Sequence, residues 1–128
     1  MDEPILELVH RDGRGDIYRV AIPPDREIMI FRCRAGFLRG GHSHTCPEIV
    51  SVLSGRMRYH KTVDGVATVE ERGPGDAWAN LPGEPHMGEF LEESWVVEWK
   101  YGPDAGEGRW TTVDHAPYRD LIEAGRHG

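Results

Sequence analysis

Short stretches that alternate polar and apolar residues, each closed by glycine, proline or aspartate, follow one another along this chain. Asp64-Gly65 stands between two of them and predicts a tight β-hairpin, because both residue types tolerate the positive φ of a two-residue turn. About ten short strands at such spacing are typical of an antiparallel sandwich or small barrel. The sequence therefore predicts an all-β fold that ends in a short helix. The expected strands cover residues 5–9, 17–22, 27–34, 49–53, 56–63, 66–72, 76–80, 86–91, 94–101 and 109–113, a turn covers 11–16, and the helix covers 117–126.

Length and charge narrow the class of protein. With 128 residues the chain is expected to form one domain over residues 1–128. Its 15 Lys and Arg against 22 Asp and Glu give a net charge of −7, which argues against nucleic acid or an anionic membrane as a partner. No apolar run approaches the length of a membrane span, and the acidic N-terminus does not resemble a signal peptide. We therefore expect a cytoplasmic protein.

The segment from Gly36 to Gly55 carries the densest group of metal-ligating side chains. His42 and His44 are two residues apart, so both point to one face of an extended strand. Pro47 cannot donate to a sheet ladder, and a bend there would bring Glu48 back toward the histidine pair. Two imidazoles and a carboxylate on one face favour a divalent transition metal, and His86 is a fourth candidate ligand.

This segment resembles the first sequence motif of the cupin superfamily. The second cupin motif is matched in part, because Leu81 stands where a proline is expected and Phe90 stands where an asparagine is expected. The matched positions are Gly36, His42, His44, Glu48 and Gly55 of the first motif, which is complete, and Gly75, Gly83 and His86 of the second.

The resemblance implies both a fold and a cofactor. The fold would be the cupin double-stranded β-helix, a jelly-roll barrel, and the ligands would be His42, His44, Glu48 and His86. This donor set suits one divalent ion of Fe, Mn, Ni, Co or Zn, and the sequence does not choose among them.

Other residues are candidates for contact with a small-molecule substrate. Tyr59 and His60 are neighbours on one expected strand and point to opposite faces, so they compete for a proton-transfer role. Glu98 is a further candidate for moving a proton. Arg39 next to the histidine strand could meet an anionic group, and Trp78 could line the pocket.

The leading functional hypothesis is a metal-dependent enzyme of isomerase, epimerase or lyase type. It would act on a small polar metabolite and stabilise enolate-like charge as a proton leaves. An Fe(II) dioxygenase would use the same ligands, and a non-catalytic small-molecule-binding cupin is a hypothesis of another class.

The sequence also suggests a metal-free enzyme and a partner. The segment from Arg39 to His44 is similar to a stretch of sugar-nucleotide 3,4-ketoisomerases, which implies a metal-free enzyme whose two histidines move protons. A homodimer is expected, because open edge strands at residues 5–9 and around Trp110 invite pairing.

Overall fold

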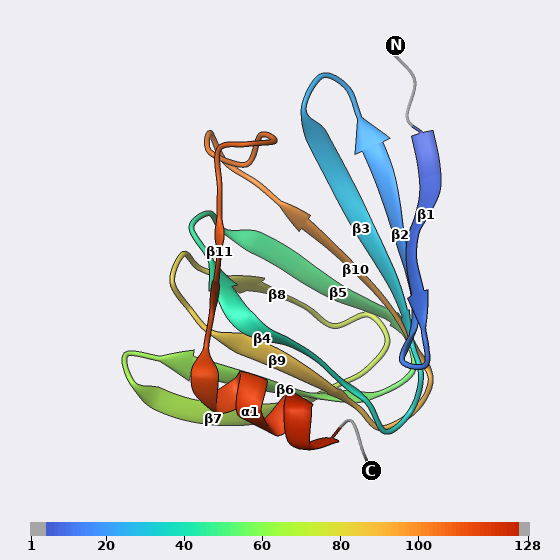
Figure 1. Cartoon of the computed structure of the whole chain (residues 1–128), viewed down its shortest axis with the longest axis vertical. Coiled ribbons are helices and arrows are strands. Elements are labelled where there is room, and N and C mark those ends of the chain that lie inside the picture. Colours follow the sequence, from blue (N-terminus) through green and yellow to red (C-terminus); the bar gives the residue numbers. More distant parts are fainter. Residues whose placement is uncertain (1–4, 126–128) are drawn as a thin grey trace.

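Two antiparallel sheets face each other in the computed structural model of the chain, which describes residues 5–125 (Figure 1). The larger sheet has the strand order β1-β2-β3-β10-β5-β8 and the smaller one has the order β11-β4-β9-β6-β7. The larger sheet consists of β1 (Ile5–Asp12), β2 (Gly15–Ile22), β3 (Arg26–Cys33), β10 (Ser94–Lys100), β5 (Glu48–Ser54) and β8 (Ala77–Asn80). The smaller sheet consists of β11 (Thr112–Asp114), β4 (Leu38–His44), β9 (His86–Phe90), β6 (Met57–Val63) and β7 (Val66–Arg72).

The core lies between the sheets and is built from alternate residues of the inner strands. Val50 and Val96 of the larger sheet are buried against Met57 and Phe90 of the smaller one. Cys33 is fully buried in the same cluster, as expected of a small apolar side chain. Alternate side chains of a strand point to opposite faces, so the other half of each strand faces outward.

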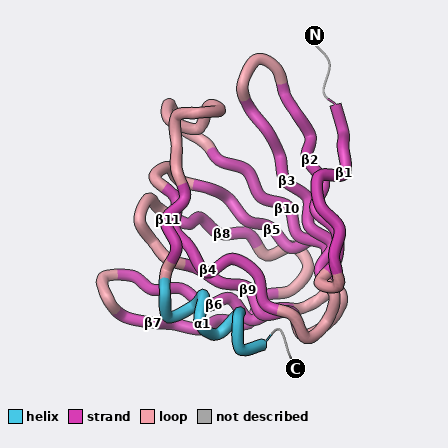
Figure 2. Tube along the Cα trace, viewed as in Figure 1, coloured by secondary structure: helices cyan, strands magenta, loops and turns pink. Residues whose placement is uncertain are grey.

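The helix α1 (Ala116–Gly125) covers the outer face of the smaller sheet (Figure 2). Its buried residues Tyr118 and Ile122 are four positions apart, on one side of the helix, and pack against Met87 and Leu38. Among residues 5–125, no helix is long and apolar enough to cross a membrane.

The jelly-roll fold and the C-terminal helix agree with the prediction. The Asp64-Gly65 hairpin is confirmed, with φ of 51° and 78° at the two turn residues. The predicted turn over 11–16 is too long, because β1 continues to Asp12 and β2 starts at Gly15. Arg11 and Asp16 face each other across this strand pair and form an ion pair at 2.8 Å, so charged residues that resembled a turn belong to the ladder.

Candidate metal centre and cavity

Three histidines converge inside the barrel. His42 and His44 come from β4, and His86 comes from the neighbouring strand β9, where the register places it opposite His42. The ring centroids are 4.6 Å apart for His42 and His44, 5.0 Å for His42 and His86, and 5.3 Å for His44 and His86. One ring nitrogen of each lies within 4.8 Å of the others, so the three side chains could hold one metal ion.

A bulge in β4 sets the approach to these histidines. The register between β4 and β9 shifts between Gly40 and His42, and Gly40 and Gly41 have φ of 98° and 81°. Gly40 lines the cavity described below. A Cβ on Gly41 would come within 2.9 Å of Ile122, so the glycine is required for close packing of α1 against the strand.

Glu48 reaches the same cluster from the opposite sheet, as the first residue of β5. Its side chain is fully buried, and its carboxylate oxygens lie 3.1 Å from Nε2 of His86 and 3.5 Å from Nε2 of His44. Asn80 donates to it at 2.9 Å, and Nζ of Lys100 lies at 3.4 Å. Burial opposes ionisation, but these partners outweigh it and hold the pKa of Glu48 below its ordinary value.

Burial keeps two of the imidazoles neutral. It lowers the pKa of His42 to about 4 and the pKa of His44 to about 3. A neutral imidazole is the form that binds a metal.

Hydrogen bonds to the far ring nitrogens hold two of the rings. Nδ1 of His44 lies 3.0 Å from the hydroxyl of Thr112, and Nδ1 of His86 lies 3.1 Å from the carbonyl oxygen of Glu84. A carbonyl oxygen only accepts, so the proton of His86 lies on Nδ1 and a neutral ring turns the lone pair of Nε2 inward.

The inward-facing atoms fit a cation. Nε2 of His44 is buried and has no hydrogen-bond partner. Nε2 of His86 lies 3.1 Å from a carboxylate oxygen of Glu48, so an imidazole nitrogen and a carboxylate converge at one point. Ligand atoms about 2.1 Å from one ion lie about 3.0 Å apart at right angles and about 3.4 Å apart in a tetrahedron. The 3.1 Å and 3.5 Å separations around Glu48 match these values.

A cavity with about 80 Å³ of water-accessible space adjoins the cluster. Its polar lining includes His42, His86, Arg39 and Glu98, and the rest is largely apolar side chains. Burial, reinforced by the negative charge of Glu48, raises the pKa of Glu98 to about 8. Glu98 therefore carries a proton at neutral pH.

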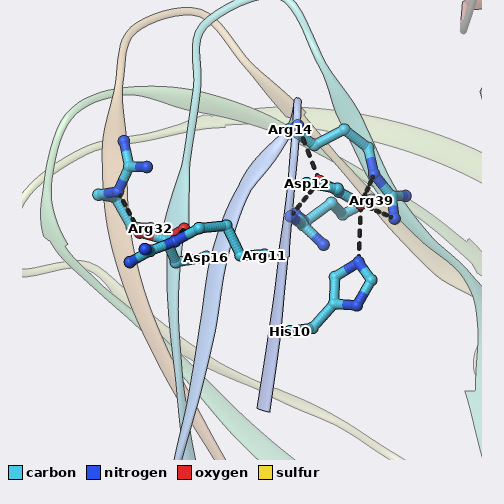
Figure 3. A network of polar contacts seen from close by, with 7 residues as sticks. All are labelled: His10, Arg11, Asp12, Arg14, Asp16, Arg32 and Arg39. Carbon is cyan, nitrogen blue, oxygen red and sulfur yellow. Dashed lines mark hydrogen bonds and ion pairs between the residues drawn. The ribbon is translucent and has the colours of Figure 1, made fainter. Parts of the chain in front are cut away.

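Arg39 is the cation of this cavity. Its side chain is only 11% exposed, and its Nε and Nη2 atoms are buried without a hydrogen-bond partner. The nearest carboxylate oxygen, on Asp12, is 3.6 Å from Nη2, and Asp12 is itself held by Arg14 and His10 (Figure 3). Burial lowers the pKa of Arg39, but a guanidinium stays charged in proteins.

The other predicted site residues lie at different distances from the cavity. Tyr59 lines it, stacks on His86 at 6.1 Å between centroids, and accepts a hydrogen bond from Asn80 at 2.6 Å. His60 points to the outer face, where it contacts Glu89 at 3.1 Å beneath α1. Trp78 packs edge-on against Tyr59 at 4.6 Å but does not line the cavity.

Three residues that support the site were missed by sequence reasoning. Asn80 links Glu48 to Tyr59, Lys100 lies beside Glu48 and over the ring of Trp110, and Thr112 contacts His44. They are separated from their partners by 21 to 68 positions in the chain. No spacing pattern in the sequence singles them out.

Comparison with known proteins identifies the fold. No family model and no curated protein matches the chain. Among solved structures, Bacillus subtilis oxalate decarboxylase at pH 4.6 matches 92% of this chain and 34% of its own, with 19% identity and a TM-score of 0.64. CapF, the capsular polysaccharide assembling protein from Staphylococcus aureus, matches 88% of this chain and 32% of its own, with 16% identity and a TM-score of 0.63.

These comparisons and the strand topology together define a cupin fold, as the two motifs predicted. The chain spans about a third of the length of these neighbours. Another structure of the Bacillus subtilis oxalate decarboxylase, with 19% identity, coverage of 84% of this chain and 30% of its own and a TM-score of 0.64, is described as having Mn(II) centres.

Proposed function

We propose that this protein is a metal-dependent enzyme that performs isomerase, epimerase or lyase chemistry on a small carboxylate-bearing metabolite. The proposal is carried by one observation. Two imidazoles and a buried guanidinium with unpartnered N–H groups line the same small cavity. The histidines and Glu48 suit a divalent cation, and Arg39 suits an anion, so a substrate with oxygen donors can contact both ends.

His42, His44, His86 and Glu48 would hold the ion. The first three offer ring nitrogens within 4.8 Å of one another, and Glu48 contacts two of them. A divalent ion held there polarises a substrate oxygen and stabilises the negative charge that develops on it.

Glu98 is the group that we assign to proton transfer. It lines the cavity, and it is protonated near neutral pH, so it enters the reaction as an acid and can take a proton back at a later step. Tyr59 lies at the same cavity, but burial raises the pKa of its hydroxyl well above 10. We assign Tyr59 to holding Asn80, and through it Glu48, in place.

The substrate would be small. About 80 Å³ of water-accessible space admits a molecule of a few carbon atoms, and the apolar walls exclude further charged groups. Arg39 can bind a carboxylate through two parallel N–H groups, which fixes its orientation.

The test combines metal analysis with a search for turnover. Protein purified without chelator is analysed for bound metal and incubated, with Mn, Fe(II) or Zn, with short-chain mono- and dicarboxylates while products are followed by NMR. We expect about one ion per chain and metal-dependent conversion of at least one carboxylate, both lost in His86→Ala. Ion binding without conversion of any substrate would support a non-catalytic small-molecule-binding cupin.

Two outcomes would overturn the proposal and identify a different reaction. Oxygen consumption that depends on Fe(II) and is absent with Mn or Zn would identify a dioxygenase. Turnover of a nucleotide-linked keto-sugar by metal-free protein would identify a ketoisomerase that uses His42 and His44 as proton carriers.

A further inference from the structure

Lys100 brings a positive charge to the edge of the histidine cluster. It is the last residue of β10, and the register places it opposite Glu48, the first residue of β5. Its side chain is 9% exposed, and its Nζ atom lies 3.4 Å from Oε2 of Glu48. The backbone fixes this end of the strand, because the amide of Tyr101 donates to the carbonyl oxygen of Pro47 at 3.1 Å. The ammonium is therefore held beside a carboxylate that also contacts two histidines.

Lys100 lies outside the cavity that the proposed substrate would occupy. Glu98 precedes it by two positions on β10 and lines that cavity, whereas Lys100 does not. Nζ of Lys100 lies 4.1 Å from the ring centroid of Trp110, and this ring packs edge-on against His44 with centroids 5.6 Å apart. Any effect of Lys100 on the chemistry of the cavity must therefore pass through Glu48 and the bound ion.

Glu48 does not need Lys100 to hold its position. Asn80 donates to Oε1 of Glu48 at 2.9 Å, an ordinary hydrogen-bond length, and the side chain of Glu48 is fully buried. An ammonium and a carboxylate that form a strong hydrogen bond are about 2.7–2.9 Å apart, so the 3.4 Å contact of Lys100 is a loose one. We therefore expect the carboxylate to keep its orientation when Lys100 is neutralised. What changes is the charge beside it.

The charges of Glu48 and Lys100 cancel before a metal ion arrives. The neutral imidazoles of His42 and His44 add no charge to this pair. An ion bonded to Oε2 of Glu48 at about 2.1 Å would lie no farther than about 5.5 Å from Nζ of Lys100, since 3.4 Å separates that oxygen from Nζ. At this separation, in a largely buried site, like charges repel each other strongly.

We propose that Lys100 weakens the binding of the metal ion and, by the same charge, makes the bound ion a stronger electrophile. Lys100 offsets the negative charge that Glu48 supplies, so the ion keeps more of its own charge for a substrate oxygen at the cavity. The face of Trp110 gives the ammonium a second favourable contact, which holds it beside the cluster while Glu48 binds the ion. The proposal rests on the metal site of the proposed function and assigns Lys100 to tuning that site.

Titration of metal-free protein with Mn²⁺ and Zn²⁺, in competition with a chelator, tests this role. Lys100→Met keeps an unbranched side chain and removes the charge, and we expect it to bind each ion at least about 10-fold more tightly than wild type. Lys100→Gln should change the affinity in the same direction, whereas Lys100→Arg retains the charge and should keep the weaker binding. Arg58→Met is the matched control, because it removes a positive charge from a side chain that is 50% exposed.

The direction of the change separates tuning from support. Removal of a residue that only holds the site together lowers metal affinity, whereas loss of the Lys100 charge should raise it. Lower or unchanged affinity in Lys100→Met and Lys100→Gln would overturn the proposal, and so would an equal gain in Lys100→Arg or in Arg58→Met. Circular dichroism checks the folding of each variant, and Lys100→Gln keeps the test decisive if Lys100→Met does not fold. Wild type that binds neither ion would instead refute the metal site of the proposed function.

The midpoint potential of iron-loaded protein tests the effect on the ion itself. Loss of a neighbouring positive charge favours Fe(III) over Fe(II), because the ion of higher charge is repelled more strongly. We therefore expect a lower potential in Lys100→Met than in wild type, and no shift in Arg58→Met. Equal potentials in Lys100→Met and wild type would show that the charge of Lys100 does not reach the ion, and would overturn the proposal.

Discussion

The cavity has a histidine end and an arginine end, which differ in how many of their hydrogen-bonding groups have partners within the protein. At the histidine end, two Nδ1 atoms have partners in Thr112 and Glu84, and Glu48 is held by Asn80. At the other end, Arg39 is nearly as buried, yet two of its nitrogens have no hydrogen-bond partner. An orphaned buried N–H costs free energy, so the fold keeps one end prearranged for a cation and leaves the other short of an acceptor.

The largest expected effect is at the histidine end. His44→Ala and His86→Ala each remove a nitrogen from the cluster, and we expect metal affinity to fall by more than about 100-fold, since loss of supporting hydrogen bonds alone costs up to that much. Metal content after dialysis and titration calorimetry measure the effect. His60→Ala is the control, because that ring lies on the outer face. Unchanged metal content in both cluster variants would refute the assignment.

The next effect is at the arginine end. Arg39→Met is expected to weaken binding of a small carboxylate by about 30-fold, because a charge-assisted hydrogen bond is worth about 2 kcal/mol. The same change should stabilise the ligand-free protein in urea, since an unsatisfied buried charge is removed. Arg58→Met, at an arginine with a 50% exposed side chain, is the control. Carboxylate affinity that is insensitive to Arg39→Met would show that the cavity binds its ligand elsewhere.

A smaller effect is expected from a residue that only orients a ligand. Thr112→Val keeps the shape of the side chain and removes the hydroxyl beside Nδ1 of His44. We expect metal affinity to fall by about 10-fold with no change in stoichiometry. The control is Thr111→Val, because Thr111 contributes its backbone to the neighbouring contacts. Equal affinity of Thr112→Val and wild type would show that packing alone fixes the ring.

A separate effect is on the stability of the metal-free protein and depends on pH. Glu98 has a pKa of about 8 when folded against an ordinary 4.5, so the folded state holds a proton that the unfolded state releases between these values. The free energy of unfolding therefore falls as pH rises from about 4.5 to 8. Glu98→Gln in metal-free protein should raise it by up to about 4 kcal/mol at pH 8 and leave it unchanged at pH 4, since one pKa unit corresponds to about 1.4 kcal/mol. An equal gain at both pH values would contradict the raised pKa.

Local patterns predicted much of the fold, because strand alternation and turn chemistry act over a few residues. The fixed motif positions placed His42, His44 and His86 together, since neighbouring strands of the smaller sheet carry them. Which of Tyr59 and His60 faces inward depends on pairing between β6 and β9, and their alternation alone left it open. Asn80 and Lys100 are 32 and 52 positions from Glu48, so only the folded chain reveals these contacts. One domain over residues 1–128 stays a prediction.

The short strand β11 ties the last part of the barrel to the cation site. Its three exposed residues pair with β4, and its first residue, Thr112, contacts the ring of His44. When β11 frays away from β4, the ring of His44 loses its contact with Thr112. A metal ion that binds better to the ring held by Thr112 must therefore, by thermodynamic linkage, also stabilise the pairing of β11 with β4. The rate of hydrogen exchange at the exposed β11 amides would thus report whether the buried histidine cluster holds a metal ion.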